Sequence, residues 1–340
     1  MPDDLPLITV AIPVLNEAEC LTKLYDELCS ACDPLPYDFE FLFVDDGSTD
    51  RTAEILTDLR RKDERICFVL LSRNFGHQAA LCAGLGHAAG DAVIMMDGDL
   101  QHPPQVIPQL LERWQAGYDV VNTQRVETEG IDPLKQFWSA SFYRVFNWVA
   151  NMSLKPGSAD FRLLSRVAVD VLNDLPERHR FLRGLVPWLG FRQTAVEFTA
   201  PTRWAGRSKY GFLRNLRFAL DGITAFSFYP LRRVTVLGWI ITLASLAYGA
   251  FALTTHLLGR GTVPGWTSLL LCILFFGGCQ LLVAGVLGEY IGRILEEVKG
   301  RPLYVARAMA GLSPLRPRSA EVASPARRWP GPMRPERKAE

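Results

Sequence analysis

The sequence predicts an α/β domain with a mostly parallel sheet, followed by two transmembrane helices that form a hairpin. Strand and helix patterns alternate from the N-terminus to about residue 121, which is typical of βα units that assemble a parallel sheet. Two runs without Asp, Glu, Lys or Arg follow toward the C-terminus. Each is long enough to cross a hydrocarbon layer about 30 Å thick.

The alternating segments are short apolar runs separated by amphipathic ones. The expected strands are Ile8–Pro13, Phe39–Val44, Ile66–Leu71, Ala92–Met96 and Tyr118–Val121. The expected helices are Ala18–Cys32, Thr52–Lys62, Gln78–Ala89 and Pro104–Ala116. Sheets of this kind bind ligands at the carboxyl ends of their strands. Functional side chains are therefore expected in the loops that follow the strands.

The two uncharged runs are Thr235–Leu258 and Trp266–Gly288, and the connection between them is short enough to force a hairpin. Basic residues flank the hairpin and predict that both of its ends face the cytoplasm. These are Arg232, Arg233, Arg293, Lys299 and Arg301, against Arg260 alone in the connection. We therefore expect a multi-pass protein of the inner (plasma) membrane. The alternative is a pair of helices buried in a large soluble core.

The expected organisation has five parts. Residues 1–211 form a cytosolic domain, residues 212–232 an amphipathic helix, residues 233–291 the hairpin, residues 292–313 a cytosolic helix and strand, and residues 314–340 a disordered basic tail. The amphipathic helix fits the membrane interface and the surface of the soluble core equally well. The N-terminus carries acid where a signal peptide needs a basic flank.

Charge and cysteine content exclude some classes of partner and fold. With 37 Lys and Arg against 36 Asp and Glu, the net charge of +1 gives no reason to expect nucleic acid. The 7 cysteines are an odd number scattered through apolar stretches, which indicates free thiols in a reducing compartment. Cys29 and Cys32 form a C-x-x-C pair without a second pair, and we interpret them as small helix residues.

Two acidic loops follow expected strands. The run from Val44 to Asp50 is typical of any strand-to-helix turn with an N-cap. The second loop holds Asp97 and Asp99, whose carboxylates would repel each other without a cation. With the amide oxygen of Gln101 they form an oxygen-only set that suits Mg²⁺ or Mn²⁺ rather than zinc. The alternative is two solvated turn acids. We interpret His77, His87 and His102 as loop or surface residues.

These loops belong to a series of six ordered motifs: Ile12–Glu17, Val44–Asp50, Leu71–Gln78, Asp97–Gln101, Asp160–Arg166 and Arg203–Tyr210. The series resembles glycosyltransferase family 2. The resemblance runs from about residue 7 to about residue 305. More specifically, the motifs resemble those of the polyprenyl-phosphate glycosyltransferases related to dolichyl-phosphate mannose synthase, including bactoprenol glucosyltransferases. The resemblance implies a GT-A fold, a nucleotide-sugar donor, a divalent metal and inversion at the anomeric carbon.

The resemblance also implies roles for individual residues. Pro13, Asn16 and Glu17 would line the nucleotide pocket, and Asp45, beside Asp46 in the substrate-binding loop, would contact the base. Asp97, Asp99 and Gln101 match the metal and diphosphate positions. The basic and hydroxyl groups that gather the phosphates would be Arg125, Arg203, Ser208 and Lys209. Three positions depart from the family pattern: Gly98 replaces a common Ala, His102 a common acid, and Ala159 a common Gly.

The chemistry of such a transfer sets its own demands. A phosphate acceptor is already an oxygen nucleophile near neutral pH, so it requires no strong general base. The site must instead hold two anionic reactants together, for which Arg125, Arg203, Arg207 and Lys209 are candidates. We count Asp99, Asp160, Arg125 and Arg203 as the catalytic candidates. Asp160 fits three roles, which are a grip on a sugar hydroxyl, a base and a helix N-cap before Leu163.

We therefore expect transfer of a hexose, with UDP-glucose as the favoured UDP-sugar donor, to undecaprenyl or another polyprenyl phosphate at the cytoplasmic membrane face. GlcNAc, mannose or a modified pentose is the alternative sugar. A processive synthase would need more membrane spans and a Gln at position 200, where this chain has Ala. A silent nucleotide-sugar-binding module would be expected to lack Asp97 or Asp99. The sequence leaves association into a homo-oligomer open.

Overall fold

The structure is a computed structural model, and it describes residues 5–125, 158–178, 180–199, 229–258 and 265–312. Several predictions lie outside these residues. They concern Arg203, Arg207, Ser208 and Lys209, the amphipathic helix up to residue 228, most of the short connection in the hairpin and the basic tail.

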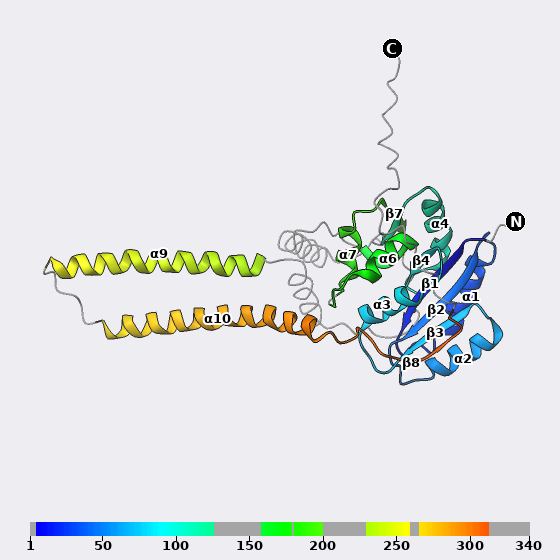
Figure 1. The fold of residues 1–340 in the computed structure, drawn as a ribbon, viewed down its shortest axis with the longest axis horizontal. Coiled ribbons are helices and arrows are strands. Elements are labelled where there is room, and N and C mark those ends of the chain that lie inside the picture. Colours follow the sequence, from blue (N-terminus) through cyan, green and yellow to red (C-terminus); the bar gives the residue numbers. More distant parts are fainter. Residues whose placement is uncertain (1–4, 126–157, 179, 200–228, 259–264, 313–340) are drawn as a thin grey trace, which may run out of the picture.

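The N-terminal half alternates strands and helices, as expected (Figure 1). The strands are β1 (Leu7–Val14), β2 (Asp38–Asp45), β3 (Ile66–Leu71), β4 (Ala92–Met95) and β5 (Val120–Arg125). The helices between them are α1 (Leu21–Cys32), α2 (Thr52–Lys62), α3 (His77–His87) and α4 (Ile107–Gln115), the last preceded by the 3₁₀ turn η1 (Pro104–Val106). The strand expected at Tyr118–Val121 begins later, at Val120, because the Tyr118 N–H still donates to the Arg113 carbonyl of α4. It also continues further, to Arg125.

The second part of the domain adds β6 (Ser158–Ser165), α6 (Arg166–Asp174), α7 (Leu182–Trp188) and β7 (Gln193–Phe198). The full sheet has 8 strands in the order β7-β5-β6-β4-β1-β2-β3-β8. The strands β4, β1, β2 and β3 pair in parallel, and so do β5 and β7. Strand β6 lies antiparallel between β4 and β5. The sheet is thus mixed and mostly parallel.

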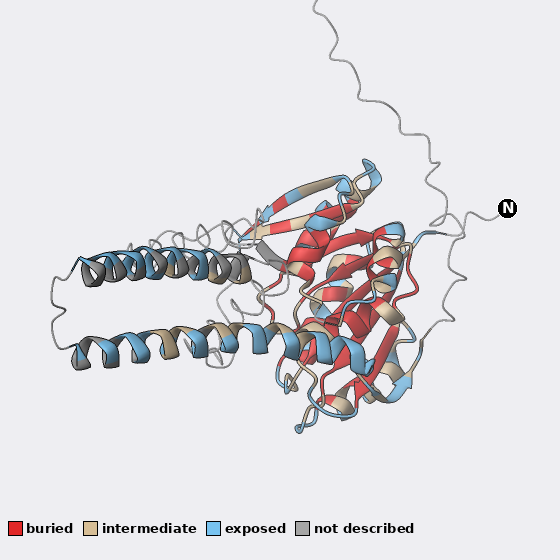
Figure 2. Ribbon diagram, turned by 60° about the vertical axis from the view of Figure 1, so that its left-hand side comes forward, coloured by how far each residue is buried: buried red, intermediate tan, exposed pale blue. Residues whose placement is uncertain are grey.

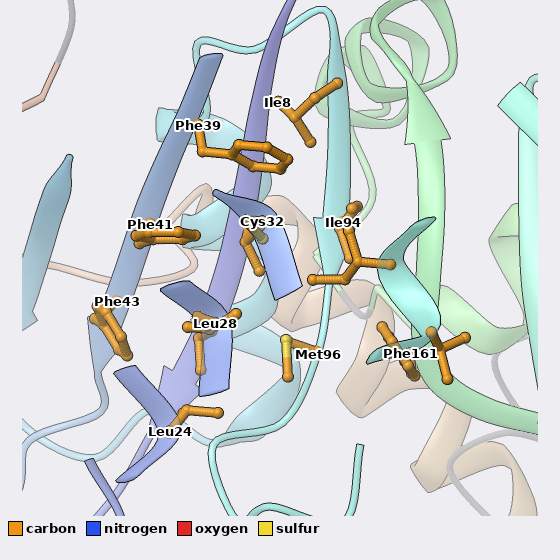
Figure 3. Packing of buried hydrophobic residues seen from close by; sticks show 14 of the residues in the cluster. Ile8, Leu24, Leu28, Cys32, Phe39, Phe41, Phe43, Ile94, Met96 and Phe161 are labelled. Carbon is orange, nitrogen blue, oxygen red and sulfur yellow. The ribbon is translucent and has the colours of Figure 1, made fainter. Parts of the chain in front are cut away.

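Helices cover both faces of the sheet (Figure 1). On one face, α1, α2 and α4 pack on a cluster that includes Ile8, Phe41 and Phe43. Figure 3 shows this cluster, in which Phe161 lies beyond Ile94 and Met96 from the phenylalanines of β2. On the other face, α3, α6 and α7 pack on a second cluster. Residues buried on both faces explain why β1 to β4 are almost continuous apolar runs.

Two long helices extend away from this domain, α9 (Tyr229–Leu257) and α10 (Trp266–Lys299) (Figures 1 and 2). They run antiparallel beside each other in both views. Large apolar side chains on both helices are exposed, for example Trp239 at 64% and Leu281 at 77%. Within the described residues, the stretch Phe275–Lys299 is long and apolar enough to cross a membrane, and none of it is buried inside the protein.

After α10 the chain returns to the sheet. Strand β8 (Ala306–Ala310) pairs antiparallel with β3 at one edge. The N–H of Ser72 donates to the carbonyl of Val305 at 2.8 Å, and the N–H of Arg178 donates to the Glu297 carboxylate at 2.9 Å. The C-terminal end of α10 is therefore held against the domain by the segment that follows it and by the hydrogen bond to Glu297.

Candidate active site

The loops after β1, β2 and β4 meet at the carboxyl edge of the parallel strands. Asn16, after β1, has a left-handed backbone with φ of 54°, which Asn tolerates better than most residues. Its side-chain oxygen accepts the N–H of Thr49 at 2.8 Å, and its own N–H donates to Ser48 Oγ at 2.9 Å. The N–H of Glu17 donates to Thr52 Oγ1 at 3.2 Å. The first two loops thus form one bonded unit.

The two acids that end β2 have different surroundings. Asp45 is fully buried; its Oδ1 accepts the N–H of Ser48 at 2.9 Å. Its Oδ2 is buried and accepts no hydrogen bond from the described part of the chain. Both oxygens of Asp46 accept backbone N–H groups, from Phe75 at 2.7 Å and Gly76 at 3.0 Å. Burial raises the pKa of Asp46, although these two donors act in the opposite direction.

Gly47 brings the loop after β2 against the loop after β3. It has a φ of 75°, and a Cβ atom there would lie 2.5 Å from the backbone carbon of Arg73. Gly98 is confined in the same way by β1, because a Cβ atom would lie 2.8 Å from Val14 Cγ1. This contact accounts for one departure from the family pattern: the loop after β4 lies too close to β1 for the common Ala.

The loop after β4 carries the expected cation ligands. Asp97 Oδ1 is buried and accepts no hydrogen bond within the described residues, and the nearest basic group in contact with it is His77 Nε2 at 3.5 Å. Asp99 Oδ1 accepts the N–H of Gln101 at 3.1 Å. Leu100, between them, is buried with a φ of 61°. A buried carboxylate oxygen without a hydrogen-bond donor fits a cation ligand.

No group of three or more His, Cys, Asp or Glu side chains that could hold a metal gathers within the described residues. Two carboxylates are too few to complete the shell of Mg²⁺ or Mn²⁺. The set therefore fits an ion whose remaining ligands come from substrate phosphates and water, not a metal enclosed by protein.

Asp160 lies in β6, which excludes the helix N-cap among the three roles considered for it. It is buried at 3% exposure, and both of its oxygens accept hydrogen bonds from Arg183 at 2.9 Å. Arg162 Nη2 lies 3.5 Å from Oδ1, and His77 Nε2 lies 3.6 Å from Oδ2. Burial opposes the charged form, but His77 and the two arginines outweigh it and hold the pKa of Asp160 well below its usual range.

His77 and His102 were interpreted as loop or surface residues, and the structure brings both imidazoles to the acidic loop after β4. His77 begins α3, with its imidazole between Asp97 and Asp160. Burial acts against its charged form, but these two carboxylates outweigh it and raise the pKa of His77. His102 is 7% exposed and accepts the N–H of Asp97. The sequence did contain one indication of a functional role for His77: it directly follows Gly76 at the end of the loop after β3.

Arg183 is a further residue of this cluster that the sequence did not single out. It comes from α7, which lies outside the motifs. Arg125, by contrast, was singled out and lies exposed at the end of β5. No ion pair or hydrogen bond brings Arg125 to the carboxylates in the part of the chain that the structure describes.

A family model described as glycosyl transferase family 2 matches residues 9–170. An uncharacterised glycosyltransferase of Synechocystis is 43% identical over 305 residues, which cover 90% of this chain and 96% of the relative. The chain belongs to glycosyltransferase family 2. The family resemblance predicted from the motifs is thereby confirmed.

Other members of the family have more specific names. A prophage-derived bactoprenol glucosyl transferase of Shigella flexneri is 41% identical over 300 residues, which cover 88% of this chain and 97% of that protein. Among solved structures, Staphylococcus aureus TarS in complex with UDP-GlcNAc aligns with 65% of this chain and 66% of its own, at 18% identity and a TM-score of 0.45. That structural likeness is too low to support an argument about function.

Proposed function

We propose that this family 2 member transfers glucose from UDP-glucose to a polyprenyl phosphate, with inversion, at the cytoplasmic face of the membrane. The observation that carries the proposal is the acidic edge of the sheet. There, Asp45 and Asp97 each keep a buried oxygen that accepts no hydrogen bond from the residues that the structure describes. This oxygen of Asp45 could accept a hydrogen bond from the base of a nucleoside diphosphate, and the corresponding oxygen of Asp97 could bind the metal ion that accompanies it.

The donor base would bind at Asp45. A uracil ring presents an N–H that Asp45 Oδ2 can accept, while Ser48 continues to occupy the other oxygen. The loop residues Pro13, Asn16 and Glu17 would lie along the nucleotide, and their bonds to the β2 loop fix their place before the donor arrives. Asp46 would act indirectly, because its oxygens hold the Phe75–Gly76 turn.

Asp97 and Asp99, with Gln101, would hold the divalent cation. When bound, the cation would stabilise the negative charge that develops on the departing UDP, as a Lewis acid. His77 would lie beside this site and supply a donor or positive charge between Asp97 and Asp160. This positive charge reduces the repulsion that two carboxylates would otherwise exert on an incoming diphosphate.

The nucleophile would be an oxygen of the lipid phosphate. It carries a negative charge at neutral pH and so requires no proton to be removed. The structure of Asp160 agrees with a reaction that lacks a protein base, because Arg183 occupies both of its oxygens and its pKa is lowered. Arg125, Arg203, Arg207, Ser208 and Lys209 remain our candidates for gathering the phosphates.

Anchoring would bring the domain to its lipid substrate. We propose that α9 and α10 form the transmembrane hairpin, with the exposed apolar side chains of both helices against lipid. The relatives named bactoprenol glucosyl transferases support a lipid acceptor. Strand β8 and the bond from Arg178 to Glu297 would then hold the catalytic domain close to the headgroup layer.

The test uses the purified full-length protein with undecaprenyl phosphate, Mg²⁺ or Mn²⁺ and a panel of radiolabelled nucleotide sugars. With labelled UDP-glucose as the donor, we expect radiolabel to appear in the lipid extract. The transferred label should disappear when EDTA is added and in the Asp99→Ala variant. Asp58→Ala, which removes an exposed carboxylate on α2, should retain transfer. Equal transfer by wild type and Asp99→Ala would refute the mechanism. Transfer from another sugar nucleotide alone would correct the donor.

A further inference from the structure

His102 is a buried imidazole that the proposed reaction does not use. It lies between the acidic loop and η1, and it is 7% exposed. It is also one of the positions at which this chain departs from the family, which commonly has an acid there. A polar side chain that is buried beside a reactive loop needs hydrogen-bond partners, and those partners indicate its role.

The Nδ1 atom of His102 accepts the backbone N–H of Asp97 at 2.9 Å. Because Nδ1 accepts this hydrogen, the ring proton resides on Nε2. The bond closes the loop from Asp97 to His102 into a ring. It also fixes the peptide that orients the Asp97 side chain, whose Oδ2 lies 3.7 Å from the same nitrogen.

The other side of the imidazole is held by aromatic rings. It stacks on Phe161 at 5.2 Å between centroids with an angle of 20°, and it meets the edge of Phe198 at 6.0 Å. Phe161 follows Asp160 in β6 and belongs to the main core cluster (Figure 3). The stack therefore joins the acidic loop to β6, the strand that carries Asp160, which pairs with Arg183 of α7.

The loop itself needs such support. Leu100 has a left-handed backbone with φ of 61°, a conformation that non-glycine residues adopt only where surrounding contacts enforce it. Asp97 and Asp99 also repel each other when no cation is bound. A carboxylate at position 102 would accept the same N–H but add a third negative charge. The imidazole accepts it without that charge.

We infer that His102 is a positioning residue that holds the Asp97–Asp99 loop in its cation-binding shape before the cation arrives. The inference rests on the proposed function for the identity of the ligand, but it concerns contacts within this chain. Since Nδ1 already accepts the Asp97 N–H, this atom positions the loop and does not itself bind the metal. The acceptor at Nδ1 and the aromatic stack make separable contributions, to loop shape and to stability.

Two substitutions separate these contributions in the full-length protein. His102→Phe keeps a ring for the stack and removes the acceptor, whereas His102→Asn keeps an acceptor near the position of Nδ1 and removes the ring. Each variant is titrated with Mn²⁺ alone, and the decrease of the free-ion electron paramagnetic resonance signal gives its affinity for Mn²⁺. Thermal unfolding gives the stability of each variant.

We expect His102→Phe to bind Mn²⁺ about tenfold more weakly, because the loop in its cation-binding shape would leave the Asp97 N–H without an acceptor. Its Tm should fall less than that of His102→Asn, because the ring stack is kept. His102→Asn should bind within about threefold of wild type, although its Tm falls. Wild-type affinity in His102→Phe would overturn the inference. So would losses of affinity in both variants that follow their losses of Tm, because these would indicate a purely structural role.

Hydrogen exchange of the Asp97 amide in the metal-free protein keeps the two proposals apart. If the wild type binds no Mn²⁺, the metal in the proposed function fails, and the exchange rate still tests His102. Faster exchange in His102→Phe than in His102→Asn supports the positioning role. Equal exchange in the two variants contradicts it.

Discussion

Asp45 and Asp46 are adjacent in the chain, yet the structure gives them different tasks. Both are buried at the end of β2. Both oxygens of Asp46 accept backbone N–H groups of the loop after β3, whereas one oxygen of Asp45 accepts no hydrogen bond from the described part of the chain. The difference arises because Asp46, the first residue after β2, faces the backbone N–H groups of Phe75 and Gly76. At the residue scale, then, the Asp45 oxygen that has no hydrogen-bond partner among the described residues is the atom that we propose for binding the donor base.

Asp45→Asn tests this assignment. The amide oxygen can still accept the Ser48 N–H, but an amide N–H would replace the unfilled oxygen and face the N–H of uracil. We expect UDP to bind about tenfold more weakly or worse, since a hydrogen bond to a charged group is worth about 1.5–3 kcal/mol. Isothermal titration with UDP measures the loss, and Asp58→Asn on exposed α2 is the control. Unchanged UDP affinity in Asp45→Asn would place the base elsewhere.

Asp160→Asn tests the buried pair with Arg183. Removing one partner of a buried ion pair costs about 3–5 kcal/mol of folding stability, so Tm should fall at pH 7. The pKa of Asp160 is lowered in the folded state. Its contribution is therefore fully present above the unfolded pKa of about 3.9, and it is lost as the pH falls below that value. The difference in Tm between wild type and variant should be largest near pH 5, because Asp160 also raises the pKa of His77 and the stability from that protonated pair is lost as the pH rises. It should narrow below about pH 4.

At the scale of elements, α1 shows how a short amphipathic helix is held by one face. Its apolar residues recur at helical spacing, and Leu21, Leu24 and Leu28 are fully buried against the sheet. Lys23 and Glu27 form an ion pair at 3.9 Å on the outer side. The helix has no side-chain N-cap bond, so packing accounts for its stability more than its ends do.

Leu28→Ala and Glu27→Ala compare the two faces of α1 directly. The first should lower the free energy of unfolding by about 2–5 kcal/mol, because it leaves a cavity in the core. The second should change it by less than about 1 kcal/mol, as is usual for an exposed ion pair. Thermal unfolding of both variants measures the difference. Similar losses at the two positions would mean that α1 does not pack as the structure has it.

At the scale of the whole molecule, the chain leaves the sheet domain, forms the two long helices α9 and α10, and then returns to the sheet as β8. Figure 2 shows the buried residues concentrated in the sheet domain and exposed residues along α10. The chain that leaves α10 pairs with β3 at the edge of the same sheet whose other strands end in the candidate site. This route makes the position of the helices and the position of the site interdependent.

The proposed hairpin makes a prediction about topology. A cysteine placed by Thr262→Cys in the connection between the helices should react with a membrane-impermeant maleimide in intact cells. A cysteine placed by Glu54→Cys on exposed α2 should react only after lysis. Each is made in a variant that lacks the native cysteines. Protection of position 262 in intact cells, with labelling after lysis, would exclude the hairpin orientation.

The sequence by itself determined the alternation of strands and helices up to β4, the family and the two acidic loops. Each of these is a local property: apolar periodicity forms one strand or helix at a time, and motifs such as Asp97–Gln101 are contiguous. The carboxyl-edge rule for parallel strands led us to expect functional side chains in the loops that follow the strands, and the candidate acids do lie in the loops after β2 and β4.

The tertiary structure alone decided where β6 inserts, what Asp160 contacts and how the two histidines are used. Strand β6 pairs with β4 and β5 from far along the chain, and a strand pairing of that kind leaves no local pattern. The contacts of Asp160 with Arg183 and of His77 with Asp97 likewise join residues from different elements. Local forces specify each segment, whereas the environment of a charged side chain depends on which segments pack against it.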